Sequence, residues 1–307
     1  MENTLKNYDI VVIPDVHGRT FWKHAIPFIK NGTNVVFLGD YLDPYSHEGI
    51  TPKEALGNFK EILSITKDKP NVTMLIGNHD FEYIIDDAPA CRCDYDNFEE
   101  ISDLFWMNLN KFHFGKQFRP DTATPPLTLS HAGIHYDWYQ ELRAELATVL
   151  ELGEDKIEHG NDVQGFLGAL DDWHKQIERE IESLLFDQSI WGILTSPVKN
   201  IYIRFLNRVS RLRGGMNMYG SMIWADIHEF TGQELLEPFG FQVVGHTMQI
   251  RKEFTDKDKG HFKWVPGDPV GMITAGNCGI LCLDCQHCYG ISHNPEKNFY
   301  DIEQIDN

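Results

Sequence analysis

The chain has 307 residues, of which 42% are hydrophobic, so it can bury the core of one large domain or of two ordinary ones. Its 27 basic and 46 acidic residues give a net charge of −19, which disfavours long nucleic acids as partners because the whole molecule repels polyanions. No run of about 18 apolar residues indicates a membrane span, and the N-terminal stretch lacks an apolar run of signal-peptide length. We therefore expect a cytoplasmic protein with no membrane partner.

Strand-like and helix-like segments alternate through the first 80 residues. Apolar runs predict strands that begin near Asp9, Asn34 and Asn71. Segments with helical spacing lie between these strands, and the second of them has Thr51 at an N-cap position and Pro52 at the first helical position. This succession is the βαβ pattern of a parallel sheet that is covered on both faces.

The second half of the chain contains two further strand candidates and a long helical stretch. The strands are expected within residues 125–135 and 241–249. Residues 137–213, between them, are rich in helix formers and in charge, and we expect them to be mostly helical. The tail from about Lys263 is apolar and rich in turn residues, which indicates strands of a second sheet.

Polar side chains stand where five of the predicted strands end. In open α/β sheets the functional groups gather at the carboxyl ends of the strands, so we expect these side chains to meet. Their oxygen and imidazole donors, with no cysteine among them, suit Mn, Fe or Zn. Two dications held about 3.5–4 Å apart need negative charge between them, and we choose Asp40 as the bridging carboxylate. The candidate metal ligands are Asp15, His17, Asp40, Asn78, His131 and His246.

Five ordered motifs in the chain resemble those of the calcineurin-like metallophosphoesterase superfamily. They are "DVHG", "GDYLD", "GNHD", "SHAG" and "VVGHT". The resemblance covers roughly residues 9–136 and 222–250, and the order of the motifs makes it specific. Within the superfamily, "WAD" at 224–226 and "HAG" at 131–133 are most similar to the branch of serine/threonine phosphoprotein phosphatases and diadenosine tetraphosphatases.

The resemblance implies an α/β fold, a four-layer α/β/β/α sandwich. We expect a single metallophosphoesterase domain over residues 1–307, with a helical insertion at about 137–213. The insertion is inferred because 115 residues separate His131 from His246, which is more than a connection between two strands needs. Such an insertion would lie beside the active-site mouth as a lid or as an element that selects the substrate.

The resemblance also implies a role for each matched residue. Asp15 and His17 would hold the first metal, Asp40 would bridge, and the other three ligands would hold the second metal. A hydroxide that bridges the metals would attack phosphorus directly, without a phosphoenzyme. His79 would protonate the leaving oxygen, and Asp43 would orient the imidazole of His79.

The implied function is hydrolysis of phosphomonoesters, on a phosphoprotein or on a small phosphorylated metabolite, with two divalent metal ions. Mn is the expected metal, and Fe and Zn are alternatives. A second hypothesis is a hydrolase of diadenosine polyphosphates or other nucleotides, which needs aromatic side chains for base stacking. A third is a non-catalytic scaffold, which the complete set of six ligands disfavours. The tryptophans available for stacking are Trp106, Trp138, Trp173 and Trp191.

The chain departs from the family at the arginine that binds phosphate in the phosphatase branch. Pro44 takes its position in "GDYLDPYS", so the substrate phosphate loses a bidentate partner. Arg19, directly after "DVHG", could replace it. Asp80 stands where the protein phosphatases have glutamate, which favours other branches slightly. A further basic group could bind the phosphate or form a solvated helix face, and it comprises Arg204, Arg208, Arg211 and Arg213.

The cysteines leave two interpretations open. Six of them are too few for a disulfide scaffold. Four lie within "CGILCLDCQHC", at a spacing that could hold zinc or an iron–sulfur cluster. Strand alternation would point Cys282 and Cys285 to opposite faces, which favours packing thiols instead. The four residues are Cys278, Cys282, Cys285 and Cys288.

Overall fold

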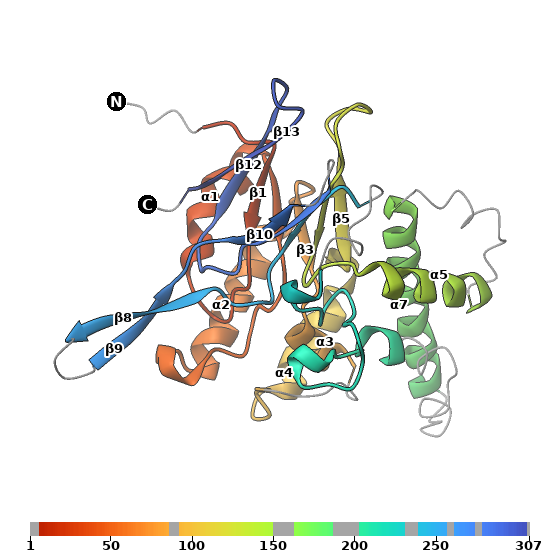
Figure 1. Ribbon diagram of the computed structural model, residues 1–307. Helices are drawn as coiled ribbons and strands as arrows, with labels where there is room; N and C mark the ends of the chain where they lie inside the picture. Colours follow the sequence, from red (N-terminus) through yellow and green to blue (C-terminus); the bar gives the residue numbers. More distant parts are fainter. Residues whose placement is uncertain are drawn as a thin grey trace.

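The fold contains two larger β-sheets, a separate two-stranded hairpin, and helices beside the sheets (Figure 1). This arrangement confirms the expected α/β class with two sheets. The computed structural model describes residues 6–85, 92–149, 163–186, 203–230, 239–256, 261–273 and 278–305.

The first sheet has six strands in the order β13-β12-β1-β2-β3-β4. Its centre is parallel, with Val11 opposite Val35 and Val36 opposite Thr73, as the βαβ pattern predicted. β12 and β13 extend the sheet in antiparallel fashion from β1. The strands are β1 Ile10–Ile13, β2 Asn34–Phe37, β3 Val72–Leu75, β4 Phe112–His113, β12 Tyr289–Asn294 and β13 Phe299–Gln304.

The second sheet has five strands in the order β10-β11-β7-β6-β5. β6, β7 and β11 run parallel, and an antiparallel strand flanks them on each side. The strands are β5 Gly115–Phe118, β6 Leu127–Ser130, β7 Phe241–Val244, β10 Val270–Ile273 and β11 Gly279–Cys282. The hairpin of β8 (Ile250–Asp256) and β9 (His261–Pro266) projects from the body of the molecule in Figure 1.

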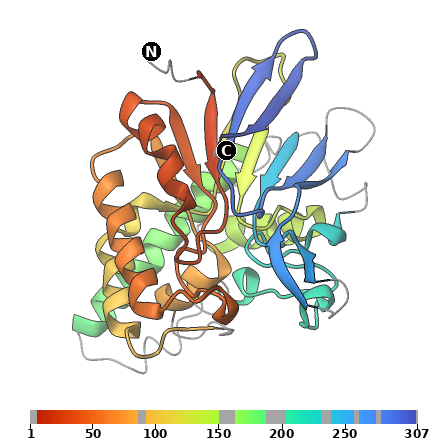
Figure 2. The same ribbon diagram turned by 90° about the vertical axis from the view of Figure 1, so that its left-hand side faces the viewer.

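Strand alternation divides the core into layers. Ile10 and Val12 of β1 lie in one buried cluster with Val243 of the second sheet, so these side chains fill the space between the sheets. Val11 faces the opposite way and shares a cluster with Phe59 of a covering helix. Figure 2 shows the resulting order from the side: helices, then the first sheet, then the second sheet.

The helices begin where the sequence provides caps. The hydroxyl of Thr51 accepts a hydrogen bond from the Glu54 backbone, and the Glu54 carboxylate accepts one from the Thr51 backbone, which is a capping box. The helix before it ends at Gly32, whose φ of 91° suits glycine. The α-helices are α1 Ile26–Asn31, α2 Pro52–Thr66, α3 Asn78–Ile84, α4 Phe98–Met107, α5 Tyr136–Val149 and α7 Val163–Phe186. The short 3-10 helices are η1 Phe21–Ala25, η2 Ser46–Glu48, η3 Leu109–Lys111, η4 Arg211–Arg213 and η5 Ile227–Glu229.

Two predictions about the second half were wrong in part. β10 and β11 join the second sheet as expected, but β12 and β13 from the same tail join the first sheet. Residues 207–213, the end of the predicted helical stretch, are not α-helical, because the chain turns back on itself around the 3-10 helix η4 so that Ser210 pairs with Asn217. This turn requires Gly215, since a Cβ there would lie 2.1 Å from the carbonyl oxygen of Val209.

The predicted helical stretch 137–213 contains α5 and α7, and its residues 150–162 and 187–202 lie outside the described part of the chain. Trp138 of α5 and Leu167 of α7 belong to the same buried cluster as Phe59. Whether the stretch is an insertion in a single domain stays a prediction. None of the described helices is long and apolar enough to cross a membrane.

The four cysteines of the tail lie in separate parts of the core. Cys288 packs under the helices, and Cys285 packs between the sheets. Cys278 and Cys282 pack together on the outer face of the second sheet. Among the residues that the structure describes, no cluster of metal-type side chains contains a cysteine. The geometry therefore favours packing thiols over a cysteine metal site.

Candidate metal centre

The six candidate ligands all lie where strands of the two sheets end. Asp15 and His17 follow β1, Asp40 follows β2, and the other three follow β3, β6 and β7. All six are buried, with at most 8% of any residue exposed. The backbone N–H of His246 donates to both carboxylate oxygens of Asp15, at 2.8 and 3.1 Å, which links the second sheet to the first.

The ligand atoms form two groups that share one carboxylate. Asp15, His17 and Asp40 make one group, and Asp40, His131 and His246 make the other, with the donor atoms of each group within 4.8 Å of one another. Asp40 Oδ2 lies 3.5 Å from His17 Nε2 and 3.6 Å from His131 Nε2. A shared carboxylate between two donor groups is the arrangement that two adjacent cations need.

Asn78 joins the second group. Its Oδ1 lies 3.1 Å from His131 Nε2, and the same nitrogen lies 3.1 Å from His246 Nδ1. His246 Nε2 is buried and has no hydrogen-bond partner among the described residues. Three side chains from three strand ends therefore direct polar atoms at one point, although buried polar atoms normally pair elsewhere. A cation at this point would engage donors from all three side chains.

Backbone carbonyls fix the orientation of two of the imidazoles. His17 Nδ1 lies 2.8 Å from the carbonyl oxygen of Leu42, and His131 Nδ1 lies 2.8 Å from that of Leu38. A carbonyl oxygen can only accept, so each Nδ1 carries the proton and each Nε2 directs a lone pair into the centre. This partner on the far nitrogen is typical of histidines that bind metal.

Burial keeps the imidazoles neutral. It lowers the pKa of His17 and of His246 well below the usual value, and it also lowers the pKa of His131. Arg213 depresses the pKa of His246 further. A neutral imidazole offers a lone pair to a metal, whereas an imidazolium does not.

The carboxylates are crowded. Burial, followed by the charges of Asp284 and Asp40, raises the pKa of Asp15 well above its usual value. Burial also acts to raise the pKa of Asp40, but the positive charge that His131 and its neighbouring histidines carry when protonated outweighs burial and lowers the pKa to about 2. Buried carboxylates beside neutral imidazoles are a donor set that divalent cations fit, because cations would offset the concentrated negative charge.

The backbone at the centre adopts an uncommon conformation. His17, Asp40, Asp43 and His246 all have positive φ, from 45° to 62°. Non-glycine residues rarely occupy this left-handed region, and such residues concentrate at functional sites. These residues, three of them candidate ligands, therefore sit on sharp turns at the strand ends.

His79 forms a buried chain of hydrogen bonds beside the two groups. His79 Nδ1 lies 2.8 Å from Asp43 Oδ2, and the hydroxyl of Tyr83 donates to Asp43 Oδ1 at 2.5 Å. The backbone N–H of Asp94 donates in turn to Tyr83 Oη, at 2.8 Å. His79 also donates its backbone N–H to Asp40 Oδ1, at 3.0 Å, which fixes its position relative to the shared carboxylate.

Asp80 holds two of the strand-end loops together, a role that the sequence did not reveal. Its carboxylate accepts from the backbone N–H groups of Gly77, Asp40 and Tyr41, at 2.7–3.0 Å. Burial and the charge of Asp40 raise the pKa of Asp80 to about 8, and the three backbone donors oppose this shift. Asp80 therefore positions Asp40 through the backbone rather than acting as a ligand.

The arginines that the sequence offered as phosphate ligands are already engaged. Arg19 Nε donates to Glu48 Oε1 at 2.9 Å, and Arg19 Nη1 donates to the Asp15 carbonyl at 3.2 Å. Arg213 pairs with Asp226 and donates to the carbonyl of His246. Of the other arginines in this group, Arg204 and Arg208 pair with Glu145 and Glu141 of α5, and Arg211 is exposed.

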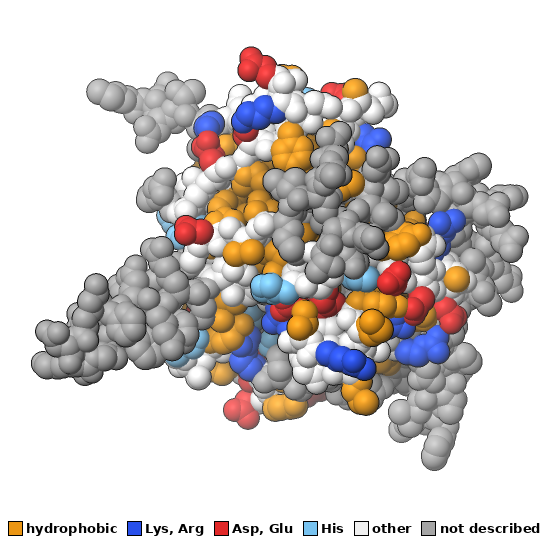
Figure 3. Space-filling view, viewed as in Figure 1, with side chains coloured by type: hydrophobic (Ala, Val, Ile, Leu, Met, Phe, Trp, Pro, Cys, Tyr) orange, Lys and Arg blue, Asp and Glu red, His pale blue; other side chains and the backbone are white. Residues whose placement is uncertain are grey.

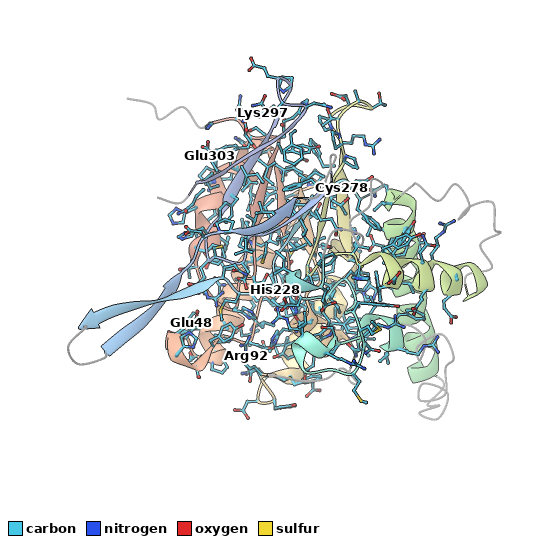
Figure 4. The ribbon with its side chains drawn as sticks, in the orientation of Figure 1. Glu48, Arg92, His228, Cys278, Lys297 and Glu303 are labelled. Atoms are coloured by element: carbon cyan, nitrogen blue, oxygen red, sulfur yellow. The ribbon has the colours of Figure 1, made fainter. Side chains whose placement is uncertain are left out.

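Arg92 reaches the centre although no motif includes it. Its Nη2 lies 3.3 Å from His79 Nε2, and its guanidinium carbon lies 3.5 Å from the ring centroid of Tyr45. In Figure 4, Arg92 and Glu48 are labelled near the same lower end of the molecule. Arg92 lies in the short stretch "CRC", and nothing in the sequence around it indicated a site residue.

A comparison with known families agrees with this geometry. The family model of the calcineurin-like phosphoesterases matches residues 8–249. No curated protein matches the chain significantly. Because the family match covers more than half of the chain, the protein belongs to the calcineurin-like phosphoesterase family and is a metal-dependent phosphoester hydrolase.

Proposed function

We propose that the protein hydrolyses phosphomonoesters, carried by a phosphoprotein or by a small phosphorylated metabolite, at a centre of two divalent cations. The observation that carries this proposal is the position of Asp40, whose carboxylate belongs to both groups of donor atoms. We place the protein in the branch of phosphoprotein phosphatases and diadenosine tetraphosphatases. The contact between Arg213, Asp226 of "WAD" and His246 supports this placement, because it joins a branch-specific motif to the centre.

Each group of donors would hold one cation. Asp15 and His17 would bind the first, the remaining imidazoles and Asn78 would bind the second, and Asp40 would bind both. When bound, the cations supply an activated water nucleophile and neutralise charge on the phosphoryl oxygens. Mn²⁺ is the preferred metal, with Fe and Zn as alternatives, because the donors are carboxylates, imidazoles and an amide oxygen.

His79 is the proposed general acid. Asp43 accepts from Nδ1–H of His79, which leaves Nε2 to present a proton to the leaving oxygen of the substrate. Tyr83 holds Asp43 from the other side, so the imidazole is oriented before substrate binds. The leaving oxygen of an alkyl monoester needs such a proton, because an alkoxide is a poor leaving group.

The two candidate stacking tryptophans whose side chains the structure describes, Trp106 and Trp138, do not favour the nucleotide alternative. Trp138 is fully buried and donates its indole N–H to the carbonyl of Phe205. Trp106 packs against the hydrophobic core. The side chain of Trp173 and all of Trp191 lie outside the described residues. Base stacking on these described rings therefore gains no support, and the monoester remains the better proposal.

A single domain with a helical insertion is also part of the proposal. Side chains of α5 and α7 share the buried cluster that contains Val11 and Phe37 of the first sheet. A continuous core of this kind supports one domain rather than two. The insertion would lie beside the centre and select the substrate.

The experiment that tests the function is Mn²⁺-dependent hydrolysis of a chromogenic phosphate monoester by the wild type and by Asp40→Asn. We expect turnover by the wild type and a loss of at least about 100-fold in the variant, because one neutralised carboxylate serves both cations. Asp301→Asn is the matched control, since it removes the same charge at an exposed site paired with Lys297. Equal turnover by Asp40→Asn and the control would refute the shared-carboxylate centre.

A further inference from the structure

The loop after β2 lacks the arginine that the phosphatase branch carries there, and it contains an aromatic side chain instead. Pro44 stands at the arginine position, and Tyr45 follows it directly. The ring of Tyr45 lies edge-on to the ring of His17, with centroids 5.2 Å apart, so this aromatic platform borders the metal donors. A dianionic phosphoryl group bound at the centre would therefore lie close to Tyr45.

Arg92 stacks on this platform from a different segment of the chain. Its guanidinium carbon lies 3.5 Å from the Tyr45 centroid, well within the distance of about 6 Å for a cation–π contact. A planar guanidinium held flat on a ring loses less freedom when it binds an anion than a mobile side chain does. The stack therefore holds Arg92 in advance at the edge of the centre.

The guanidinium of Arg92 also lies beside His79 Nε2, the proposed proton donor to the substrate. Arg92 Nη2 lies 3.3 Å from His79 Nε2, the nitrogen opposite the one that Asp43 engages. A guanidinium can only donate, so Nε2 accepts from Arg92 in the substrate-free protein. A phosphoryl group bound by Arg92 would take over this donor and leave Nε2 free to carry the proton for the leaving oxygen. A leaving oxygen that takes a proton from Nε2 would thus carry its phosphoryl group within reach of the guanidinium. The imidazole of His79 would contact the leaving oxygen, and the guanidinium of Arg92 would contact the phosphoryl oxygens of the same ester.

Arg92 also keeps donors that the described structure does not use. Its Nε is buried and has no hydrogen-bond partner there, and no carboxylate in the described ranges lies within ion-pair distance. Arg19 and Arg213 also have one buried nitrogen without a hydrogen-bond partner, but each of them, unlike Arg92, pairs with an acidic side chain. A buried donor without a partner is costly, so the arrangement favours an anionic ligand at Arg92.

We propose that Arg92 binds the phosphoryl group of the substrate in place of the arginine of the phosphatase branch, and that Tyr45 positions its guanidinium. The inference rests on the proposed function, because it assigns the phosphate-binding side chain of that same centre. In a chain with a net charge of −19, a fixed cation at this point also offsets repulsion of the dianionic substrate. Figure 3 shows basic, acidic and histidine side chains close together in the lower half of one face of the molecule.

Calorimetric titration of inorganic phosphate into the Mn²⁺-loaded protein tests the inference without requiring turnover. Arg92→Ala should bind phosphate about 10- to 100-fold more weakly than the wild type, as expected for loss of a charged hydrogen-bonding partner. Arg92→Lys should recover only part of the affinity, because an ammonium neither stacks nor binds in a bidentate manner. Arg204→Ala, which removes an arginine paired with Glu145 on the surface, should bind phosphate as the wild type does.

Variants of Tyr45 test whether its ring positions the guanidinium of Arg92 or only supports the fold. Tyr45→Phe keeps the ring and should bind phosphate within about 2-fold of the wild type, whereas Tyr45→Leu removes the platform and should approach the affinity of Arg92→Ala. Metal content and the melting temperature are measured for every variant, and only proteins with wild-type values of both are compared. If Arg92→Ala keeps wild-type phosphate affinity at full metal content, the inference is wrong.

The outcomes also separate this inference from the proposed function. A wild type that binds phosphate through Arg92 but hydrolyses no monoester would refute the monoesterase function and support the role of Arg92. If the wild type hydrolyses monoesters while Arg92→Ala shows unchanged phosphate affinity and an unchanged KM, the monoesterase function is supported and the role of Arg92 is refuted.

Discussion

Replacing His79 by alanine gives the sharpest test of the proposed proton donor. The structure holds His79 Nδ1 at 2.8 Å from Asp43, so only Nε2 is left to face a leaving oxygen. General acids of this kind contribute about 10²- to 10⁴-fold to the rate. His79→Ala should therefore lose about 10²- to 10⁴-fold in kcat/KM on an alkyl phosphate such as phosphoserine. With p-nitrophenyl phosphate, whose leaving group departs without a proton, the loss should stay below about 10-fold.

The assay compares the two substrates with Mn²⁺ present, at equal concentrations of folded protein. The backbone N–H of His79, which donates to Asp40, remains in the variant, so metal content should be unchanged. His24→Ala, an exposed histidine on η1, is the matched control. An equal loss on both substrates would show that His79 acts on binding or on the metals rather than as a proton donor.

Three further predictions concern stability and the construction of the centre. Burial lowers the pKa of His174 to about 3. As the pH falls below the ordinary histidine pKa, His174 is therefore protonated in the unfolded chain but stays neutral in the folded protein. In urea titrations, the wild type should lose about 2 kcal/mol more unfolding free energy than His174→Leu between pH 7 and pH 5, and equal losses would contradict this. Gly245→Ala would place a Cβ 1.9 Å from Asp15 Oδ1, so metal content should fall and stability should drop by about 1–3 kcal/mol. Gly57→Ala, with open space around it, should do neither, and similar metal losses in both variants would defeat the argument. Finally, Mn²⁺ at about 100 times its dissociation constant should stabilise the folded protein by about 2.7 kcal/mol. Chelation should therefore lower the melting temperature, and an unchanged melting curve would argue against binding at these buried groups.

The sequence predicted the parallel centre of the first sheet well because that region obeys local rules. Thr51 and Glu54 cap α2 by themselves, and Gly32 ends α1 with a positive φ. The tail was harder, since alternation shows that a strand is buried but not which sheet it joins. β12 pairs with β1 across the whole length of the chain, and no local pattern encodes this contact.

Part of the candidate site could likewise be predicted from the sequence, and part of it could not. The sequence predicted that six side chains would meet, and the structure brings them together because each follows a strand whose end lies at the same edge. Their role as ligands stays a prediction. Arg92 could not be predicted, since its place at the centre depends on stacking against Tyr45, 47 positions earlier in the chain. The backbone role of Asp80 was hidden too, because "GNHD" does not show which N–H groups its carboxylate accepts.

The central claim is that two cations share Asp40, and electron paramagnetic resonance of the Mn²⁺-loaded protein tests it most directly. Two Mn²⁺ ions joined by a carboxylate about 3.5–4 Å apart are spin-coupled, so the wild type should bind two ions per chain and show a coupled spectrum. Asp40→Asn should lose the coupling and at least one ion, while Asp301→Asn should keep both. A wild type that binds one ion, or two ions with the spectrum of isolated Mn²⁺, would contradict the shared centre.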